Sequence, residues 1–220
     1  MQKSIIEFLG TFFLAFVVAI AVGGGIASNL APFAVFAALA AAIYFGGHIS
    51  GGAYNPAVAT ALWMRKTLTP QGLASYWFAQ IIAGVVAGLA AKSMPALDFP
   101  KDAFAPDMRS AVMVEFIFTL FLCFTVLQVA TAKATKGNSF YGAAIALVVL
   151  AGALSVGSVS GGAFNPAVGG ALLTAGYLDA TTFFVYAGAQ LAAAIVAGGL
   201  FKFTNPDECR ADCGCSANEF

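Results

Sequence analysis

Two copies of one tripeptide carry the most specific chemistry in this sequence. Asn55-Pro56-Ala57 and Asn165-Pro166-Ala167 each follow a glycine-rich stretch and begin a short apolar segment. Proline suits the first turn of a helix, where its missing N–H is no loss, and asparagine before it is a favoured N-cap. The capping oxygen accepts a backbone N–H, so the side-chain NH2 group stays available as a donor. Each motif therefore predicts a helix N-terminus that presents an amide donor.

Membrane-spanning helices are the elements that must position these motifs. Of the 220 residues, 60% are hydrophobic and 9% are charged, whereas a soluble domain carries about 25% charged residues. Six apolar runs are long enough to cross a bilayer of about 30 Å as helices. They are Ile5–Gly25, Ala31–Gly47, Leu73–Ala91, Ala111–Ala132, Phe140–Gly157 and Thr182–Phe203. The motif segments Asn55–Met64 and Asn165–Leu173 are too short to cross. We predict an all-α membrane protein with six transmembrane helices and two re-entrant half-helices.

The second half of the chain repeats the first. Glu7 matches Glu115 at an offset of 108. Three further matches have an offset of 110: residues 50–58 with 160–168, Tyr76 with Tyr186, and Gln80 with Gln190. Each repeat, about 1–95 and about 108–204, holds three spans. Because three is an odd number, the two repeats must have opposite orientations in the membrane. We therefore expect one channel domain over 1–204, built as an inverted repeat.

Half-helices that enter from opposite faces bring Asn55 and Asn165 together near the middle of the membrane. The positive ends of two helix dipoles lie behind these amides. A neutral molecule with an acceptor oxygen can take both donors, whereas a cation meets a positive potential. The stretches 46–52 and 157–162 are predicted to be irregular backbone at membrane depth, which is tolerated where carbonyls line a wet cavity. The motifs thus predict a pore for neutral solutes.

Basic residues predict the orientation of the chain. With the N-terminus inside, the cytoplasmic segments carry seven of them: Lys3, Arg65, Lys66, Lys133, Lys136, Lys202 and Arg210. The outer segments carry three: Lys92, Lys101 and Arg109. This excess places both termini in the cytoplasm. The polar tail 205–220 contains Cys209, Cys213 and Cys215, which can bind a soft metal or carry palmitate. We favour a flexible, reduced tail.

Other classes of function fit this sequence less well. The net charge is +0, and no basic patch indicates nucleic acid. The spans contain no paired Asp, Ser–His or metal-ligand set, so we expect neither an enzyme nor a cofactor or metal site. An ion-coupled transporter needs intramembrane charges, and Glu7 and Glu115 are the clear candidates, both near span ends. A non-conducting structural protein is the remaining alternative.

The stretch His48-Ile49-Ser50-Gly51-Gly52-Ala53-Tyr54-Asn55-Pro56-Ala57-Val58 resembles the first signature of the major intrinsic protein family, the aquaporins and aquaglyceroporins. The likeness extends over essentially the whole chain. It implies a channel for water and small neutral solutes in membrane lipid, with one pore per subunit and usually a homotetramer. It also implies that Glu7 and Glu115 accept backbone hydrogen bonds from the re-entrant loops. His48 falls at the inner end of the pore, where we favour a loop-bracing hydrogen bond over a pH sensor.

The constriction of the pore departs from the family pattern. Relatives usually have Arg three residues after the second Asn, where this chain has Val168. By the same resemblance the other filter positions are Val35, Ala153 and Gly162, and a one-residue shift of the second helix would replace Val35 by Phe36. The aspartate typical of aquaglyceroporins is also absent, since the residue after Val168 is a glycine.

This filter implies a wide, apolar and uncharged opening. We expect it to admit water and small neutral solutes such as glycerol, urea, ammonia or peroxide. A second hypothesis moves the selectivity to Phe33, Phe36 or Phe164, whose rings can swing into the opening. The alternative function is a mainly water-selective channel.

Overall fold

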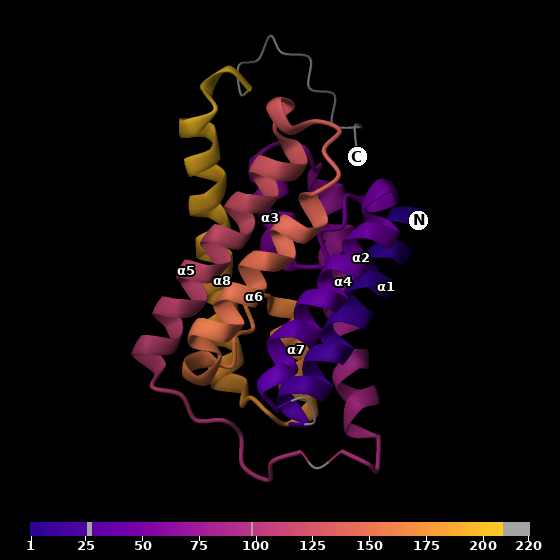
Figure 1. Cartoon of the computed structure of the whole chain (residues 1–220), viewed down its shortest axis with the longest axis vertical. Coiled ribbons are helices and arrows are strands. Elements are labelled where there is room, and N and C mark those ends of the chain that lie inside the picture. The colour runs from indigo at the N-terminus through magenta and orange to yellow at the C-terminus, as the bar shows by residue number, and fades with distance from the viewer. Residues whose placement is uncertain (26–27, 98, 209–220) are drawn as a thin grey trace.

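The computed structural model describes residues 1–25, 28–97 and 99–208, and these residues form helices joined by loops (Figure 1). Six helices are long and apolar enough to cross a membrane. They are α1 (Gln2–Val18, prolonged by a π-helical turn Ala19–Gly23), α2 (Ala31–Ser50), α4 (Pro70–Lys92), α5 (Met108–Val126, prolonged by a π-helical turn Leu127–Thr131), α6 (Tyr141–Ser160) and α8 (Ala180–Thr204). Two shorter helices are α3 (Pro56–Met64) and α7 (Pro166–Ala175). The six predicted spans and two half-helices are confirmed.

Side-chain caps set the start of three spans. The Thr69 hydroxyl accepts a hydrogen bond from Gly72 N at 3.1 Å and begins α4, and Asp179 accepts one from Thr182 N at 2.8 Å and begins α8. Asp107 caps α5 through the backbone N–H and hydroxyl of Ser110. These two bonds to its charged form lower the pKa of the Asp107 carboxyl. Caps of this kind satisfy backbone donors that a helix end leaves open.

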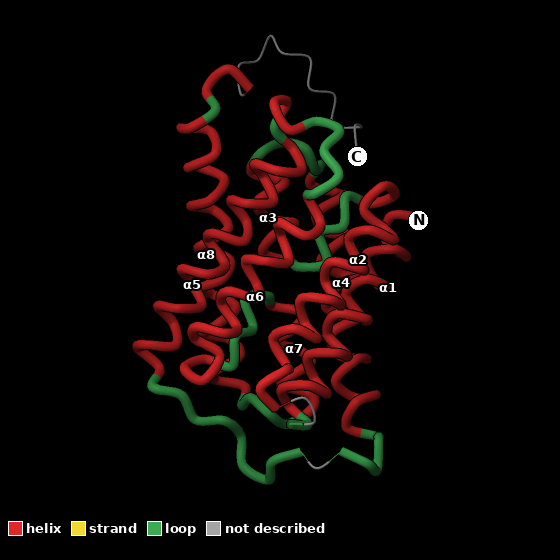
Figure 2. Tube along the Cα trace, in the orientation of Figure 1, coloured by secondary structure: helices red, strands yellow, loops and turns green. Residues whose placement is uncertain are grey.

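The two half-helices lie in opposite halves of the bundle and point their N-termini at each other (Figure 1). The start of α1 and the end of α8 lie at the same end as α3. Short loops reach the middle of the bundle from both ends and lead into α3 and α7 (Figure 2). This arrangement is the predicted inverted repeat.

The irregular backbone is shorter than the sequence predicts. Helices α2 and α6 continue to Ser50 and Ser160, so the loops cover only 51–54 and 161–164 instead of 46–52 and 157–162. A helix satisfies its own backbone groups at membrane depth, which favours its continuation. Each helix stops where two consecutive glycines take positive φ, +86° and +65° in the first loop and +82° and +66° in the second. Such φ values are open to glycine at no steric cost.

Glycines allow the half-helices to pack against the spans at backbone distance. A Cβ added at Gly84 or Gly88 of α4 would overlap backbone carbonyl oxygens of α7, those of Ala167 and Ala171. A Cβ at Gly198 of α8 would collide with the Met64 side chain of α3. Each half-helix is therefore clamped by a span through small residues, the usual means of close helix packing in lipid.

Replacing Gly88 by leucine is expected to destabilise the protein. The new side chain must displace α7, and overpacking of this kind costs about 1–3 kcal/mol, a loss of about 2–10 °C in Tm. The measurement is thermal unfolding of the detergent-purified protein. Gly199→Leu is the matched control, because a Cβ there meets no atom within 4 Å. Equal melting temperatures for the two variants would contradict the packing described.

Candidate functional site

A buried carboxylate holds the first re-entrant loop. Glu7 of α1 is fully buried and accepts hydrogen bonds from Ala53 N at 3.0 Å and Tyr54 N at 2.7 Å. The Ser50 hydroxyl, at 2.6 Å, and the Gln80 amide, at 2.8 Å, donate to the same carboxyl group. Four donors therefore surround a group that is costly to bury without partners. The loop leading to Asn55 is fixed through its own backbone N–H groups.

The second loop is held in the same way by Glu115 of α5. Its carboxyl group accepts from Ala163 N at 3.0 Å and Phe164 N at 2.7 Å. The Ser160 hydroxyl, at 2.7 Å, and the Gln190 amide, at 2.8 Å, complete the set. The two networks match donor for donor, as expected for two copies of one structural unit. Both glutamates are occupied by these loops and neither lines the lumen described below.

The two asparagines bind across the junction of the half-helices. Asn55 Oδ1 accepts from Ala57 N at 2.8 Å, and its Nδ2 donates to Phe164 O, in the opposite loop, at 3.0 Å. Reciprocally, Asn165 Oδ1 accepts from Ala167 N at 2.9 Å and its Nδ2 donates to the Tyr54 carbonyl at 2.9 Å. An amide NH2 group has two N–H donors. One N–H of each asparagine is used by the crossing bond, and the second is left for a ligand.

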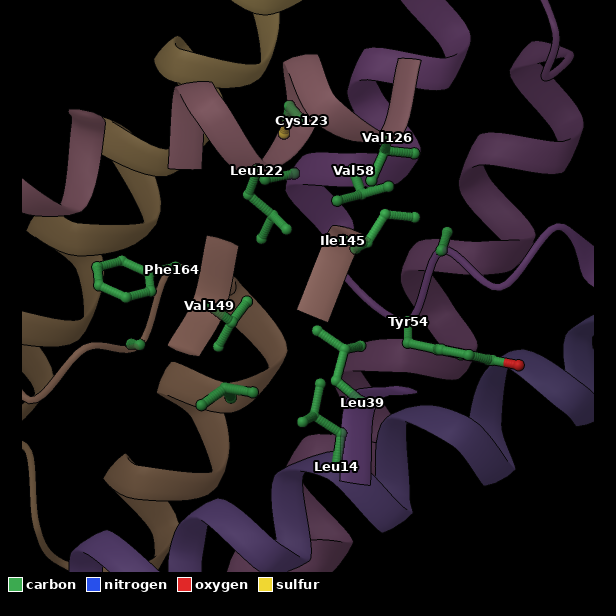
Figure 3. Packing of buried hydrophobic residues seen from close by; sticks show 14 of the residues in the cluster. Leu14, Leu39, Tyr54, Val58, Leu122, Cys123, Val126, Ile145, Val149 and Phe164 are labelled. Carbon is green, nitrogen blue, oxygen red and sulfur yellow. The ribbon is translucent and has the colours of Figure 1, made fainter. Parts of the chain in front are cut away.

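Both asparagines line a narrow, largely aliphatic lumen. The cavity has a volume of about 30 Å³, which is room for about two water molecules. Figure 3 shows Leu14, Leu39 and Val149 turned toward a common centre from α1, α2 and α6. Besides the two asparagines, one lining side chain has a polar group: the Tyr54 hydroxyl, which donates to Ala42 O at 3.0 Å. Among the described lining residues, the side-chain donors left for a molecule in the lumen are therefore the amides of Asn55 and Asn165, at the junction of the half-helices.

Three of the four predicted filter residues line this same lumen: Val35, Gly162 and Val168. Ala153 adjoins them, since a Cβ built on Gly162 would lie 3.7 Å from the Ala153 Cα atom. Val168 is 3% exposed and brings no charge to the wall. The filter positions thus meet in space, with Val35 rather than Phe36 at the lumen.

Larger aliphatic side chains line the lumen together with the predicted filter residues. Leu14 of α1 and Leu39 and Ile43 of α2 are among them. Phe164 also contributes to the wall, and its ring lies 3.6 Å from a Cβ built on Gly162. By contrast, Phe33 is half exposed and is not a lining residue.

His48 does not take the bracing position that the sequence analysis gave it. It lies exposed in the last turn of α2, and no hydrogen bond joins it to any described residue. Ser50 braces the loop instead: its hydroxyl donates to Glu7 and accepts Gly52 N at 3.1 Å. Among the described residues, no group of three or more His, Cys, Asp or Glu side chains is placed to hold a metal, and Cys209, Cys213 and Cys215 lie outside them.

The sequence analysis missed several residues that position the first half-helix. The Tyr76 hydroxyl donates to Ser50 O at 2.6 Å, and Trp77 Nε1 donates to Pro56 O at 3.0 Å. The recurrence of Tyr76 as Tyr186 was a signal for such a role. The repeat is not strict, because the buried Tyr186 hydroxyl has no partner among the described residues.

Six spans in two inverted repeats, with two capped half-helices meeting at a narrow lumen, define a membrane channel. The sequence profile described as "Major intrinsic protein" matches residues 1–155 and, in a second overlapping match, residues 111–219. The chain belongs to the major intrinsic protein family. As a member, it is a channel for water or small solutes and not an enzyme.

Individual relatives agree with this assignment. The chain is 34% identical over 194 residues to "Glycerol uptake facilitator protein-like 6" of Lactiplantibacillus plantarum, a match covering 80% of this chain and 86% of that protein. It is 32% identical over 219 residues to "Aquaporin NIP1-3" of Oryza sativa subsp. japonica, covering 93% and 75%. The solved aquaglyceroporin of Plasmodium falciparum has the same fold, with a TM-score of 0.77, 21% identity, and coverage of 94% of this chain and 98% of that chain.

Replacing Ser50 by alanine is expected to loosen the first loop. The change removes the bond to Glu7 and leaves Gly52 N without its acceptor, a cost of about 1–3 kcal/mol. Thermal unfolding of purified protein should show a Tm lower by about 2–10 °C. Ser155→Ala is the matched control, because the exposed Ser155 hydroxyl bonds only to Ala151 O within its own helix. A variant at Ser50 that melts like the control would argue against loop anchoring through this hydroxyl.

Proposed function

We propose that the chain is a passive channel for water and small neutral solutes, with a filter formed by Val35, Ala153, Gly162 and Val168. The observation that carries this proposal is the uncharged Val168 in the wall of the lumen that holds Asn55. A solute such as glycerol or urea has oxygen atoms that can accept the free amide donors, while its carbon framework contacts the aliphatic wall. An ion would lose its hydration there without replacement ligands.

The names of the relatives support both water and a small neutral solute as permeants. One relative is described as a glycerol uptake facilitator and another as an aquaporin. A mainly water-selective channel is the second candidate, and the lumen volume of about 30 Å³ favours it. The proposed site includes Asn55 and Asn165 as the central donors.

We also propose that both termini face the cytoplasm and that the subunits form a homotetramer. The orientation is supported by the basic residues Arg65, Lys66, Lys133 and Lys136, which gather at the end of the bundle where α3 ends. Inner-side enrichment of Lys and Arg is the general rule for multi-pass proteins. The tetramer is supported by family membership and by large apolar side chains on the outer surface, including Phe78 and Phe184.

Light scattering of proteoliposomes in a stopped-flow instrument tests the proposed filter. In a glycerol or urea gradient the wild-type vesicles should shrink rapidly and then re-swell as the solute enters. Val168→Arg should slow the re-swelling by about tenfold or more, because a long charged side chain would occupy the filter. Rapid shrinkage in an impermeant-osmolyte gradient should persist.

Val168→Leu separates bulk from charge, since it enlarges the side chain without adding a charge. We expect it to slow re-swelling less than the arginine does. If wild-type vesicles shrink but never re-swell, the channel is water-selective and the neutral-solute proposal fails. If the arginine leaves the solute range unchanged, Val168 is not part of the filter.

A further inference from the structure

A second cavity, of about 560 Å³, opens at the end of the bundle where α3 ends. Its walls come from the end of α3, the segment 129–138 and the start of α6 at Tyr141. We call it the inner vestibule. Gly51 lines the inner vestibule, and the next residue, Gly52, lines the lumen. Because neighbouring residues of one loop border both spaces, the inner vestibule lies at the mouth of the lumen.

The wall of the inner vestibule is strongly basic. Four of its lining residues are Arg65, Lys66, Lys133 and Lys136. Of the described residues that line it, none is acidic, and the three lysines are exposed. Its volume lies within the range of small-molecule sites, about 300–1,000 Å³. A concave wall with charge of one sign concentrates ions of the opposite sign.

A carboxylate of the chain itself shows how an oxyanion is held at the edge of this space. Glu208 Oε2 lies 2.7 Å from Arg65 Nη2, and Glu208 Oε1 accepts Lys133 N at 2.7 Å. Arg65 is only 5% exposed, and its guanidinium carbon lies 4.7 Å from the centre of the Phe201 ring. Its Nε–H has no acceptor among the described residues. The ion pair and the aromatic ring thus hold the Arg65 side chain in the wall of the inner vestibule.

We propose that the inner vestibule binds a phosphate-class oxyanion through Lys66 and Lys133, beside the Arg65–Glu208 pair. The phosphate belongs either to a free solute or to the headgroup of an anionic lipid. Topology alone places basic residues on the inner side of a membrane protein. It does not account for a buried arginine in the wall, or for the capture of a carboxylate by that arginine and by the backbone N–H of Lys133.

An anion in the inner vestibule would obstruct permeation. Gly47 and Gly51 form part of the wall, so a bound anion would lie against the entrance of the lumen and leave less room for solutes. This consequence depends on the proposed channel function. Anion binding itself does not depend on the channel function, so binding and obstruction are tested in separate experiments.

Calorimetric titration of the detergent-purified full chain with inorganic pyrophosphate tests the binding. The double variant Lys66→Gln/Lys133→Gln should bind about tenfold more weakly, as expected for two exposed charge pairs lost. Lys92→Gln/Lys101→Gln removes the same charge at the opposite end of the bundle and should bind like the wild type. Absence of wild-type binding, or equal weakening by both double variants, would overturn the proposal.

Osmotic permeability of proteoliposomes tests the obstruction and identifies the source of the phosphate. In phosphatidylcholine vesicles, pyrophosphate at constant ionic strength should lower wild-type permeability at least about threefold and leave Lys66→Gln/Lys133→Gln unchanged. A similar loss in vesicles containing phosphatidylglycerol, without added anion, would identify a lipid headgroup as the ligand. Bound pyrophosphate with undiminished permeability would overturn the obstruction. Intact binding in vesicles that show no osmotic permeability at all would instead contradict the channel function.

Discussion

Two buried carboxyl groups hold the N-termini of the two half-helices, and the pore depends on them. Glu7 and Glu115 each take two backbone N–H groups of a re-entrant loop at 2.7–3.0 Å. These loops cannot hydrogen-bond within themselves as helices do, and at membrane depth there is little bulk water to replace the missing bonds. Because the donors are backbone groups, the loop can carry glycine where the chain turns and still remain fixed. An acidic residue in a span thus serves structure here rather than coupling to ions.

The fixed loops determine what the centre of the pore can do. Asn55 and Asn165 each cap their own half-helix and bind a carbonyl of the opposite loop, so their orientation is set from both sides. The remaining donors lie in an otherwise apolar wall that includes Val168. Basic residues line the inner vestibule, beyond the first loop, and there Arg65 is held by Glu208.

Much of this architecture is predictable from the sequence. The features that could not be predicted each have a physical reason. Motifs at a fixed offset and span-length apolar runs depend on local chemistry, so the six spans and two half-helices follow from them. The bounds of the re-entrant loops could not be predicted in this way, because a helix continues in lipid until glycines at positive φ end it. The identity of the aliphatic side chains that line the lumen could not be predicted either. Helices that are apolar on every face carry no periodicity to show whether Leu14 or Leu39 faces lipid or the pore. The hydrogen bond that braces the first re-entrant loop was expected from His48 but comes from Ser50. The recurrence of Ser50 as Ser160 in the second repeat was the better indication of this role.

A structure determined in lipid at a resolution that shows ordered water tests the central claim most directly. The account predicts water oxygens about 3 Å from the Nδ2 atoms of both Asn55 and Asn165, in a file that continues past Val168 and into the inner vestibule. A dry lumen, with both amide groups turned into the protein and no water within hydrogen-bonding distance of either, would contradict it.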